Sequence, residues 1–225
     1  MNLKIKDGEK LAIVGENGSG KSTFAKILLG LYRPQSGAVR INGINLDDIK
    51  KQVRYGSACF QDYVTYALSV RNNVSLGNTE KQNCTKDILH AIDMSHLERN
   101  LFNNDIDTSV TRNFDPDGVV LSIGQSQKLS LARSFLFERG LLVLDGPSAS
   151  LDVLTENEVF ESTLRLMRNR TTIVITHRLV NVVNCDRIVY LESGKICEEG
   201  SHEELMKRQG KYAKLFSIQA SKYLT

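Results

Sequence analysis

The sequence predicts an α/β fold in which a mostly parallel sheet is flanked by helices. Short apolar runs alternate with helix-patterned segments, and only three prolines interrupt the 225 residues. The later runs are continuously apolar, as strands buried on both faces are. With 41% hydrophobic residues the chain can build a normal packed core. A disordered chain is therefore excluded.

The first part of the chain begins with a strand, a loop and a helix. Residues 10–14 form a short apolar strand that ends in a glycine-rich loop. The next helix is predicted from apolar residues at helical spacing, namely Phe24, Ile27, Leu28 and Leu31. A second strand at 39–42 is closed by Gly43, and a third at 56–61 follows a charged helix around 46–53.

The middle of the chain is predicted to be helical. From about residue 69 to 100 strand character is lost, and Ile88, Ala91 and Ile92 form one apolar face. A turn-rich segment at 105–118 leads to a helix at about 125–138. The apolar side of that helix consists of Leu129, Ala132, Phe135 and Leu136.

The last third returns to alternating strands and helices. Strands are predicted at 141–144, 172–176 and 187–191, with a helix near 155–167. We therefore expect one domain over 1–225, in which 1–68 and 141–225 form a core lobe and about 69–140 form a helical subdomain.

Composition excludes several classes of function. The 29 Lys and Arg against 26 Asp and Glu are scattered, which does not favour nucleic acid as a partner. The apolar runs are far shorter than a membrane span, so no direct span is expected. The four cysteines show no C-x-x-C spacing, which indicates reduced thiols rather than a zinc site or disulfides.

A phosphate-binding loop is the strongest chemical signal. Residues 15–22 fit the pattern G-x-x-x-x-G-K-[ST] between a predicted strand and a predicted helix. The glycines allow backbone N–H groups to surround phosphate oxygens, Lys21 adds a positive charge, and Ser22 offers a hydroxyl to Mg²⁺. The alternative is an ordinary glycine loop that caps a helix. A second element supports the first, because the apolar run 141–145 ends in Asp145, a carboxylate at a strand tip.

Residues 121–128, Leu-Ser-Ile-Gly-Gln-Ser-Gln-Lys, resemble the LSGGQ signature of ATP-binding cassette (ABC) proteins. The family's other motifs occur in the expected order: a Walker A motif at 15–22, Gln61 as the Q-loop glutamine, the signature at 121–125, a Walker B motif at 141–145, a D-loop at 150–152, and His177 as the switch histidine. The stretches 176–179 and 186–205 are similar to the exporter branch, and 60–63 and 114–128 to bacterial peptide and lantibiotic exporters. His202 lies in the second of these stretches, but it can also have a purely structural role at a solvated helix start with Ser201 as N-cap.

The resemblance implies the fold of a P-loop NTPase (RecA-like) with a helical subdomain insert and a small antiparallel β portion truncated at the N-terminus. It also implies two such domains that sandwich two ATP molecules. ATP would be held by one copy through Gly15, Glu16, Asn17, Gly18, Ser19, Gly20, Lys21, Ser22 and Thr23. Mg²⁺ would be held by Ser22, Gln61 and Asp145, while His177 would contact the γ-phosphate.

The resemblance extends to partners. The signature residues that would cap the ATP of the opposite subunit are Ser122, Ile123, Gly124 and Gln125, and Asp152 belongs to the D-loop. The expected role is the ATP-binding subunit of an exporter, which couples ATP binding and hydrolysis to movement of a transmembrane subunit. The transporter would contain a second nucleotide-binding domain, either a second copy of this chain or a different chain. This chain would lie at the cytoplasmic side of the cell membrane.

The sequence departs from the family pattern at three places. Gly146 stands where a glutamate usually polarises the attacking water, so weak intrinsic hydrolysis is expected. Ile123 replaces the first glycine of the signature, so weak ATP-driven self-dimerisation is expected. No aromatic residue precedes Gly15, where the family carries a ring that stacks on adenine. The alternative functions are therefore a degenerate, non-hydrolysing regulatory subunit or a truncated cassette.

Overall fold

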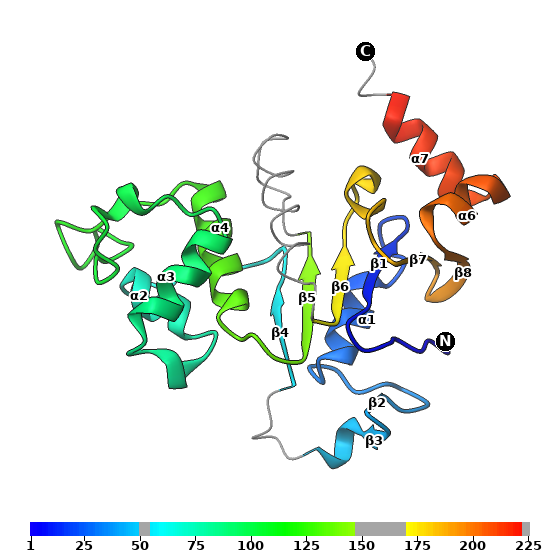
Figure 1. Ribbon diagram of the computed structural model, residues 1–225, viewed down its shortest axis with the longest axis horizontal. Helices are drawn as coiled ribbons and strands as arrows, with labels where there is room; N and C mark the ends of the chain where they lie inside the picture. Colours follow the sequence, from blue (N-terminus) through cyan, green and yellow to red (C-terminus); the bar gives the residue numbers. More distant parts are fainter. Residues whose placement is uncertain (50–54, 147–169, 222–225) are drawn as a thin grey trace. The chain divides into compact units, whose positions relative to one another are not determined.

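The computed structural model describes residues 1–49, 55–146 and 170–221. The chain divides into two compact units (Figure 1). The first unit, which we call the core unit, combines residues 1–56, 140–145 and 170–225. The second, the helical unit, combines 57–139 and 146–169. The boundaries expected for the core lobe and the helical subdomain, near 69 and 140, stay a prediction.

The sheet of the core unit is mostly parallel, as predicted. Its strands lie in the order β5-β6-β1-β7-β8, and β8 alone among these runs antiparallel to its neighbour, β7. In the register of β1, Leu11 lies beside Ile173 of β6 and Arg187 of β7. Nearly every residue of β1, β5 and β6 is buried, which explains their continuous apolar runs. The strands are β1 (Lys10–Val14), β5 (Leu141–Asp145), β6 (Thr172–Ile175), β7 (Arg187–Glu192) and β8 (Lys195–Gly200).

The helical elements of the core unit are short. The first, α1, ends at Leu28, so Leu31 is outside it and 59% exposed, contrary to the predicted apolar face. Gly30 adopts a φ of +70°, a left-handed conformation that ends the helix there. The helical elements are α1 (Lys21–Leu28), η1 (Leu46–Asp48), η5 (Leu179–Val182), α6 (His202–Arg208) and α7 (Lys211–Ser221).

A small antiparallel hairpin replaces the longer strand predicted at 39–42. It pairs β2 (Arg40–Ile41) with β3 (Ile44–Asn45). Asn42 and Gly43 both have positive φ, which is the geometry of a tight two-residue hairpin turn. The charged helix predicted around 46–53 is only the single turn η1 as far as residue 49, where the backbone is extended, and 50–54 lie outside the described residues.

The helical unit contains three α-helices, counting only described residues. These are α2 (Val70–Ser75), α3 (Thr85–Met94) and α4 (Ile123–Phe135), with the short turns η2 (Thr79–Lys81) and η3 (Arg99–Phe102). The predicted apolar faces are confirmed, because all their members on α3 and along α4 as far as Leu136 are buried. The strand β4 (Gly56–Cys59) leads into this unit from the core unit and stops short of Gln61. The helix predicted near 155–167 lies outside the described residues.

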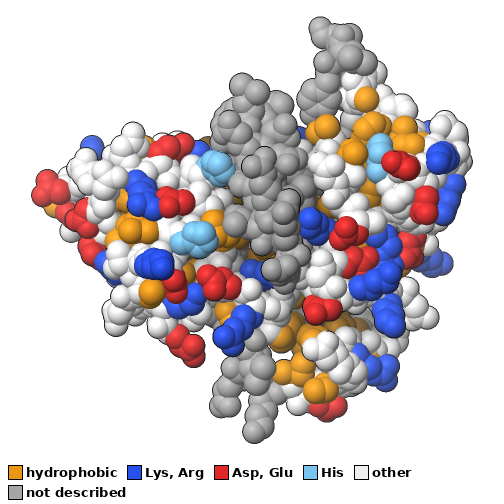
Figure 2. Space-filling model, in the orientation of Figure 1, with side chains coloured by type: hydrophobic (Ala, Val, Ile, Leu, Met, Phe, Trp, Pro, Cys, Tyr) orange, Lys and Arg blue, Asp and Glu red, His pale blue; other side chains and the backbone are white. Residues whose placement is uncertain are grey.

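Among the described residues, no helix is both long and apolar enough to traverse a lipid bilayer. On the face drawn in Figure 2, basic and acidic side chains are interspersed, as their scatter along the sequence suggests.

Candidate nucleotide site

The predicted phosphate loop connects β1 to α1 and depends on its glycines. Gly15 has a φ of +144°, and a Cβ there would lie 2.1 Å from the carbonyl oxygen of Leu191, so no side chain fits. Gly18 and Gly20 also have left-handed φ values, of +77° and +100°. The Ser19 carbonyl accepts a hydrogen bond from the Gly194 amide at 2.9 Å. The loop is thus held against the end of the sheet in a conformation that only glycine permits.

Lys21 lies inside this loop. Its side chain is buried, and its Nζ donates to the carbonyl oxygens of Gly15 at 2.9 Å and Glu16 at 2.8 Å. Burial lowers the pKa of Lys21, while the charge of Asp145 raises it. The ammonium group is therefore surrounded by oxygen acceptors, and phosphate oxygens can take the place of these carbonyls.

The first turn of α1 is exposed and has features that suit an anion. Gly20 is the N-cap, and within the described chain no side chain caps the amides that follow it. Ser22 and Thr23 are exposed in this turn. Free amides and the positive end of the helix dipole favour a bound phosphate. The hydroxyl of Ser22 and the carboxylate of Asp145 are oxygen ligands of the kind that Mg²⁺ prefers, so the donor set fits this ion.

His177 follows β6 and is electrostatically coupled to the phosphate loop. Burial lowers the pKa of His177, and the positive charge of Lys21 lowers it further, whereas the negative charge of Asp145 raises it. The structure thus brings together Lys21, Asp145 and His177, which lie far apart in the sequence. A pocket of about 200 Å³ joins the phosphate loop to the His177 loop. It is lined by Gly15, Glu16, Asn17, Thr176, His177, Leu179, Leu215 and Gln219.

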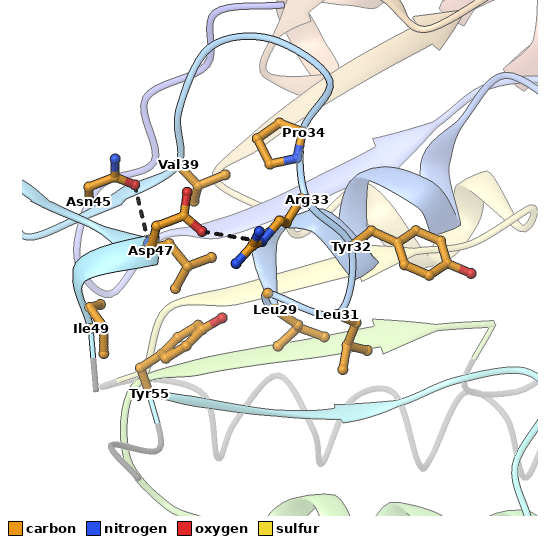
Figure 3. Close-up of a pocket in the computed structure, with 12 residues that line it drawn as sticks. Leu29, Leu31, Tyr32, Arg33, Pro34, Val39, Asn45, Asp47, Ile49 and Tyr55 are labelled. Atoms are coloured by element: carbon orange, nitrogen blue, oxygen red, sulfur yellow. Dashed lines mark hydrogen bonds and ion pairs between the residues drawn. The ribbon is translucent and has the colours of Figure 1, made fainter. Parts of the chain in front are cut away.

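A larger pocket of the core unit lies elsewhere. It has a volume of about 440 Å³ and is lined by the turn after α1, the hairpin and Tyr55 (Figure 3). Two of the lining residues, Arg33 and Asp47, form an ion pair with Nε 3.9 Å from Oδ1. This pocket is at the C-terminal end of α1, about 12 Å along the eight-residue helix from the phosphate loop. It is therefore separate from the candidate phosphate site.

The helical unit carries Gln61 and Gly146 together. Gly146 has a φ of +59°, and a Cβ added there would lie 3.6 Å from Oε1 of Gln61, an ordinary contact. The Gly146 carbonyl accepts a hydrogen bond from Nε2 of Gln127 at 3.2 Å. Sequence reasoning did not single out Gln127, because nothing in the spacing of the α4 residues marks this contact. Gly146 thus sits in a conformation that a glutamate would adopt only with strain.

The signature residues form the start of α4. Ser122 is the N-cap, and it exchanges hydrogen bonds with Gln125: the Gln125 amide donates to Oγ of Ser122 at 3.2 Å, and the Ser122 amide donates to Oε1 of Gln125 at 2.8 Å. Ile123 begins the helix and is 72% exposed, and its carbonyl accepts from the Tyr63 hydroxyl at 2.8 Å. Gly124 follows in the first turn. Asp152 and the rest of the D-loop lie outside the described residues.

His202 begins α6 with Ser201 as N-cap, and Ser201 forms a capping box with Glu204. The predicted helix start is therefore confirmed. The imidazole is not merely solvated, however, because Nδ1 lies 2.8 Å from the Tyr212 hydroxyl and the ring packs against Phe216.

Comparison with known proteins agrees with these motifs. The ABC transporter family model matches residues 1–149. The chain is 37% identical over 219 residues to the subtilin transport ATP-binding protein SpaT of Bacillus subtilis, covering 96% of this chain and 36% of that protein. It is 36% identical over 224 residues to the ATP-dependent lipid A-core flippase 1 of Colwellia psychrerythraea, covering 97% of this chain and 36% of the flippase.

A solved structure shows the same fold. The structure of a bacterial Atm1-family ABC exporter with ATP bound matches with a TM-score of 0.83 at 28% identity, over 97% of this chain and 38% of that one. The chain spans just over a third of the length of the two curated relatives named above. With its glycine loop, signature and Walker B strand in place, the chain belongs to the ABC transporter family.

Proposed function

We propose that this chain is the ATP-binding subunit of an exporter-type ABC transporter. The observation that carries the proposal is the convergence of Lys21, Asp145 and His177 at a glycine loop in which Gly15 has no room for a side chain. The matched relatives include a subtilin transport protein and lipid A-core flippases, which favours export over import.

The nucleotide is held mainly by the core unit. Residues 15–23 surround the β- and γ-phosphates of ATP with backbone amides, Lys21 supplies positive charge, and His177 donates a hydrogen bond to the γ-phosphate. Mg²⁺ would be held by Ser22, Gln61 and Asp145, and it would offset the negative charge of the phosphates. Burial and the charge of Lys21 lower the pKa of His177, which favours the neutral imidazole with one N–H to donate.

The partners follow from the exporter role. A transmembrane subunit carries the substrate and holds this chain at the cytoplasmic side of the cell membrane. A second nucleotide-binding domain, identical or different, places its phosphate loop opposite the signature residues 122–125 of this chain.

Hydrolysis by this chain is slow in our proposal, because Gly146 offers no carboxylate to polarise the attacking water. The alternative of a degenerate regulatory subunit rests on the same residue and on Ile123. The comparisons give it no support, since the relatives named above are transport proteins and ATP-dependent flippases. We therefore treat the chain as a transport ATPase subunit with a weakened catalytic step.

The test is nucleotide binding by the purified chain, followed by thermal stabilisation and by calorimetry with MgATP. Lys21→Ala should weaken ATP binding by more than about 100-fold, because it removes a charged donor from a buried phosphate site. Lys26→Ala is the matched control, since Lys26 lies on the same helix with its Nζ 5.7 Å from the Tyr32 ring. ATP binding that survives Lys21→Ala would refute the proposed site.

A further inference from the structure

The C-terminal helix α7 reaches the loop that carries His177. Nε2 of Gln219 on α7 donates to the carbonyl oxygen of His177 at 2.6 Å. Oε1 of the same side chain accepts from the amide of Leu179 at 2.9 Å. Only one orientation of the amide group pairs both atoms, so a single side chain fixes the backbone on both sides of Arg178.

The second of these bonds completes a helix terminus. Leu179 is the first residue of η5, and its N-cap, Arg178, provides no side-chain cap. A helix start without a cap leaves amides unpaired. Gln219 satisfies the first of them from another helix, so the conformation of the His177 loop depends on α7.

The beginning of α7 packs against the hydrophobic cluster of the core unit, and the helix then runs on from α6 toward the C-terminus (Figure 1). Its residue Tyr212 is fully buried in a cluster that also contains Leu179 and Val182 of η5. Leu215 and Phe216 pack against the same cluster. The Tyr212 amide donates to Oε2 of Glu198 on β8 at 3.1 Å, and Lys211 pairs with Glu192 of β7. Gln219 is therefore presented by a helix that is anchored at its beginning.

Gln219 also lies close to the phosphate loop. With Leu215 it lines the pocket of about 200 Å³ whose other walls include Gly15, Asn17 and His177. The residues of this pocket all belong to the core unit. A change at Gln219 can thus reach the nucleotide through the His177 loop without any change in the glycine loop.

We propose that Gln219 is a positioning residue that holds the His177 backbone so that its imidazole addresses the γ-phosphate of ATP. This inference rests on the proposed nucleotide site. It assigns to α7 a part in distinguishing ATP from ADP, since only ATP has the phosphate that His177 would contact.

The experiment compares the affinities of the full chain for MgATP and MgADP by calorimetry. His177→Ala should lower the ATP affinity about tenfold and leave the ADP affinity within twofold. Gln219→Ala should lower the ATP affinity about fivefold with the same unchanged ADP affinity. The double variant should lose no more than His177→Ala alone, because Gln219 acts through His177.

Two further variants separate positioning from general destabilisation. Gln219→Glu keeps an acceptor for the Leu179 amide but turns an oxygen toward the His177 carbonyl, so its loss of ATP affinity should equal or exceed that of Gln219→Ala. Ser217→Ala, at an exposed position of α7, should change neither affinity. Unchanged ADP binding also shows that each variant is folded, since ADP uses the same glycine loop.

The outcomes are distinguishable. If the unmodified chain shows no ATP binding that depends on Lys21, the proposed function fails. If that binding is present but Gln219→Ala leaves the ratio of ATP to ADP affinity unchanged, or lowers both affinities equally, the role of Gln219 fails. The role of Gln219 also fails if His177→Ala leaves the ratio of ATP to ADP affinity unchanged. It fails likewise if the losses of ATP affinity in the double variant are additive.

Discussion

The core unit and the helical unit differ in how completely they keep the family's motifs. In the core unit the phosphate loop, Lys21, Asp145 and His177 match the pattern and are brought together. In the helical unit Gly146 and Ile123 depart from it. The residues that would bind the phosphates of ATP are thus kept, whereas those that would stack on adenine, activate water and clamp a partner's nucleotide are missing or altered. Binding and turnover therefore need not be lost together.

The largest effect in this comparison is expected at Gly146. Gly146→Glu should raise ATP turnover about 10- to 100-fold, because a general base contributes ~10²–10⁴ in rate. The gain is reduced because the φ of +59° costs a non-glycine residue about 1–2 kcal/mol. Space is not the obstacle, since the nearest atoms to an added Cβ are those of Gln61 at 3.5 to 3.6 Å.

Gly146→Gln is the matched control for phosphate release. It introduces the same backbone strain and a side chain of the same length, but no carboxylate. Equal turnover in the two variants would mean that the missing carboxylate does not limit hydrolysis. High turnover in the unmodified chain, abolished by Lys21→Ala, would mean that another group positions the water.

The parts of the fold that follow from local pattern were predictable. The strands β1, β5, β6 and β7 have buried apolar interiors, and the glycine spacing of 15–22 marks the loop before α1. The edge strand β8 was not predicted, since Lys195, Glu198 and Glu199 make it polar and half exposed. Its stability depends on pairing with β7, including the ion pair of Glu199 with Arg187, which is a tertiary contact.

In the candidate site, too, the features that depend on tertiary contacts could not be predicted from the sequence. Lys21, Asp145 and His177 were found because each occupies a recognisable place in a motif. Gln219 was not, because its two hydrogen bonds join positions about 40 residues apart and depend on how α7 packs. The left-handed backbone at Gly146 was equally hidden, since glycine permits that conformation without requiring it.

The second largest effect is expected at the signature, on self-association of the chain. Ile123→Gly should strengthen MgATP-dependent self-association about tenfold, because it removes an exposed β-branched side chain where backbone would approach the partner's nucleotide. Val120→Gly is the control, since Val120 is 71% exposed just before the signature. Sedimentation velocity with a non-hydrolysable ATP analogue measures the association. Tight association of the unmodified chain would show that Ile123 is tolerated.

The smallest effect tests the electrostatic coupling within the core unit. Because the charge of Lys21 lowers the pKa of His177, Lys21→Met should raise that pKa in an NMR titration. His202 is the internal reference: burial lowers its pKa while Glu203 raises it, so Lys21→Met should leave it unchanged. A parallel shift of both histidines would contradict a local coupling.

The lowered pKa of His177 determines whether the free energy of unfolding rises or falls with pH. With a folded-state pKa below the usual 6.5, the unfolded state binds more protons at His177, so the free energy of unfolding rises with pH. The unmodified chain should therefore lose stability below about pH 6.5 relative to His177→Gln, as measured by urea denaturation. Because His177 is exposed to solvent, screening should keep this difference in stability small. Opposite slopes would mean that Asp145, rather than burial and Lys21, controls this histidine.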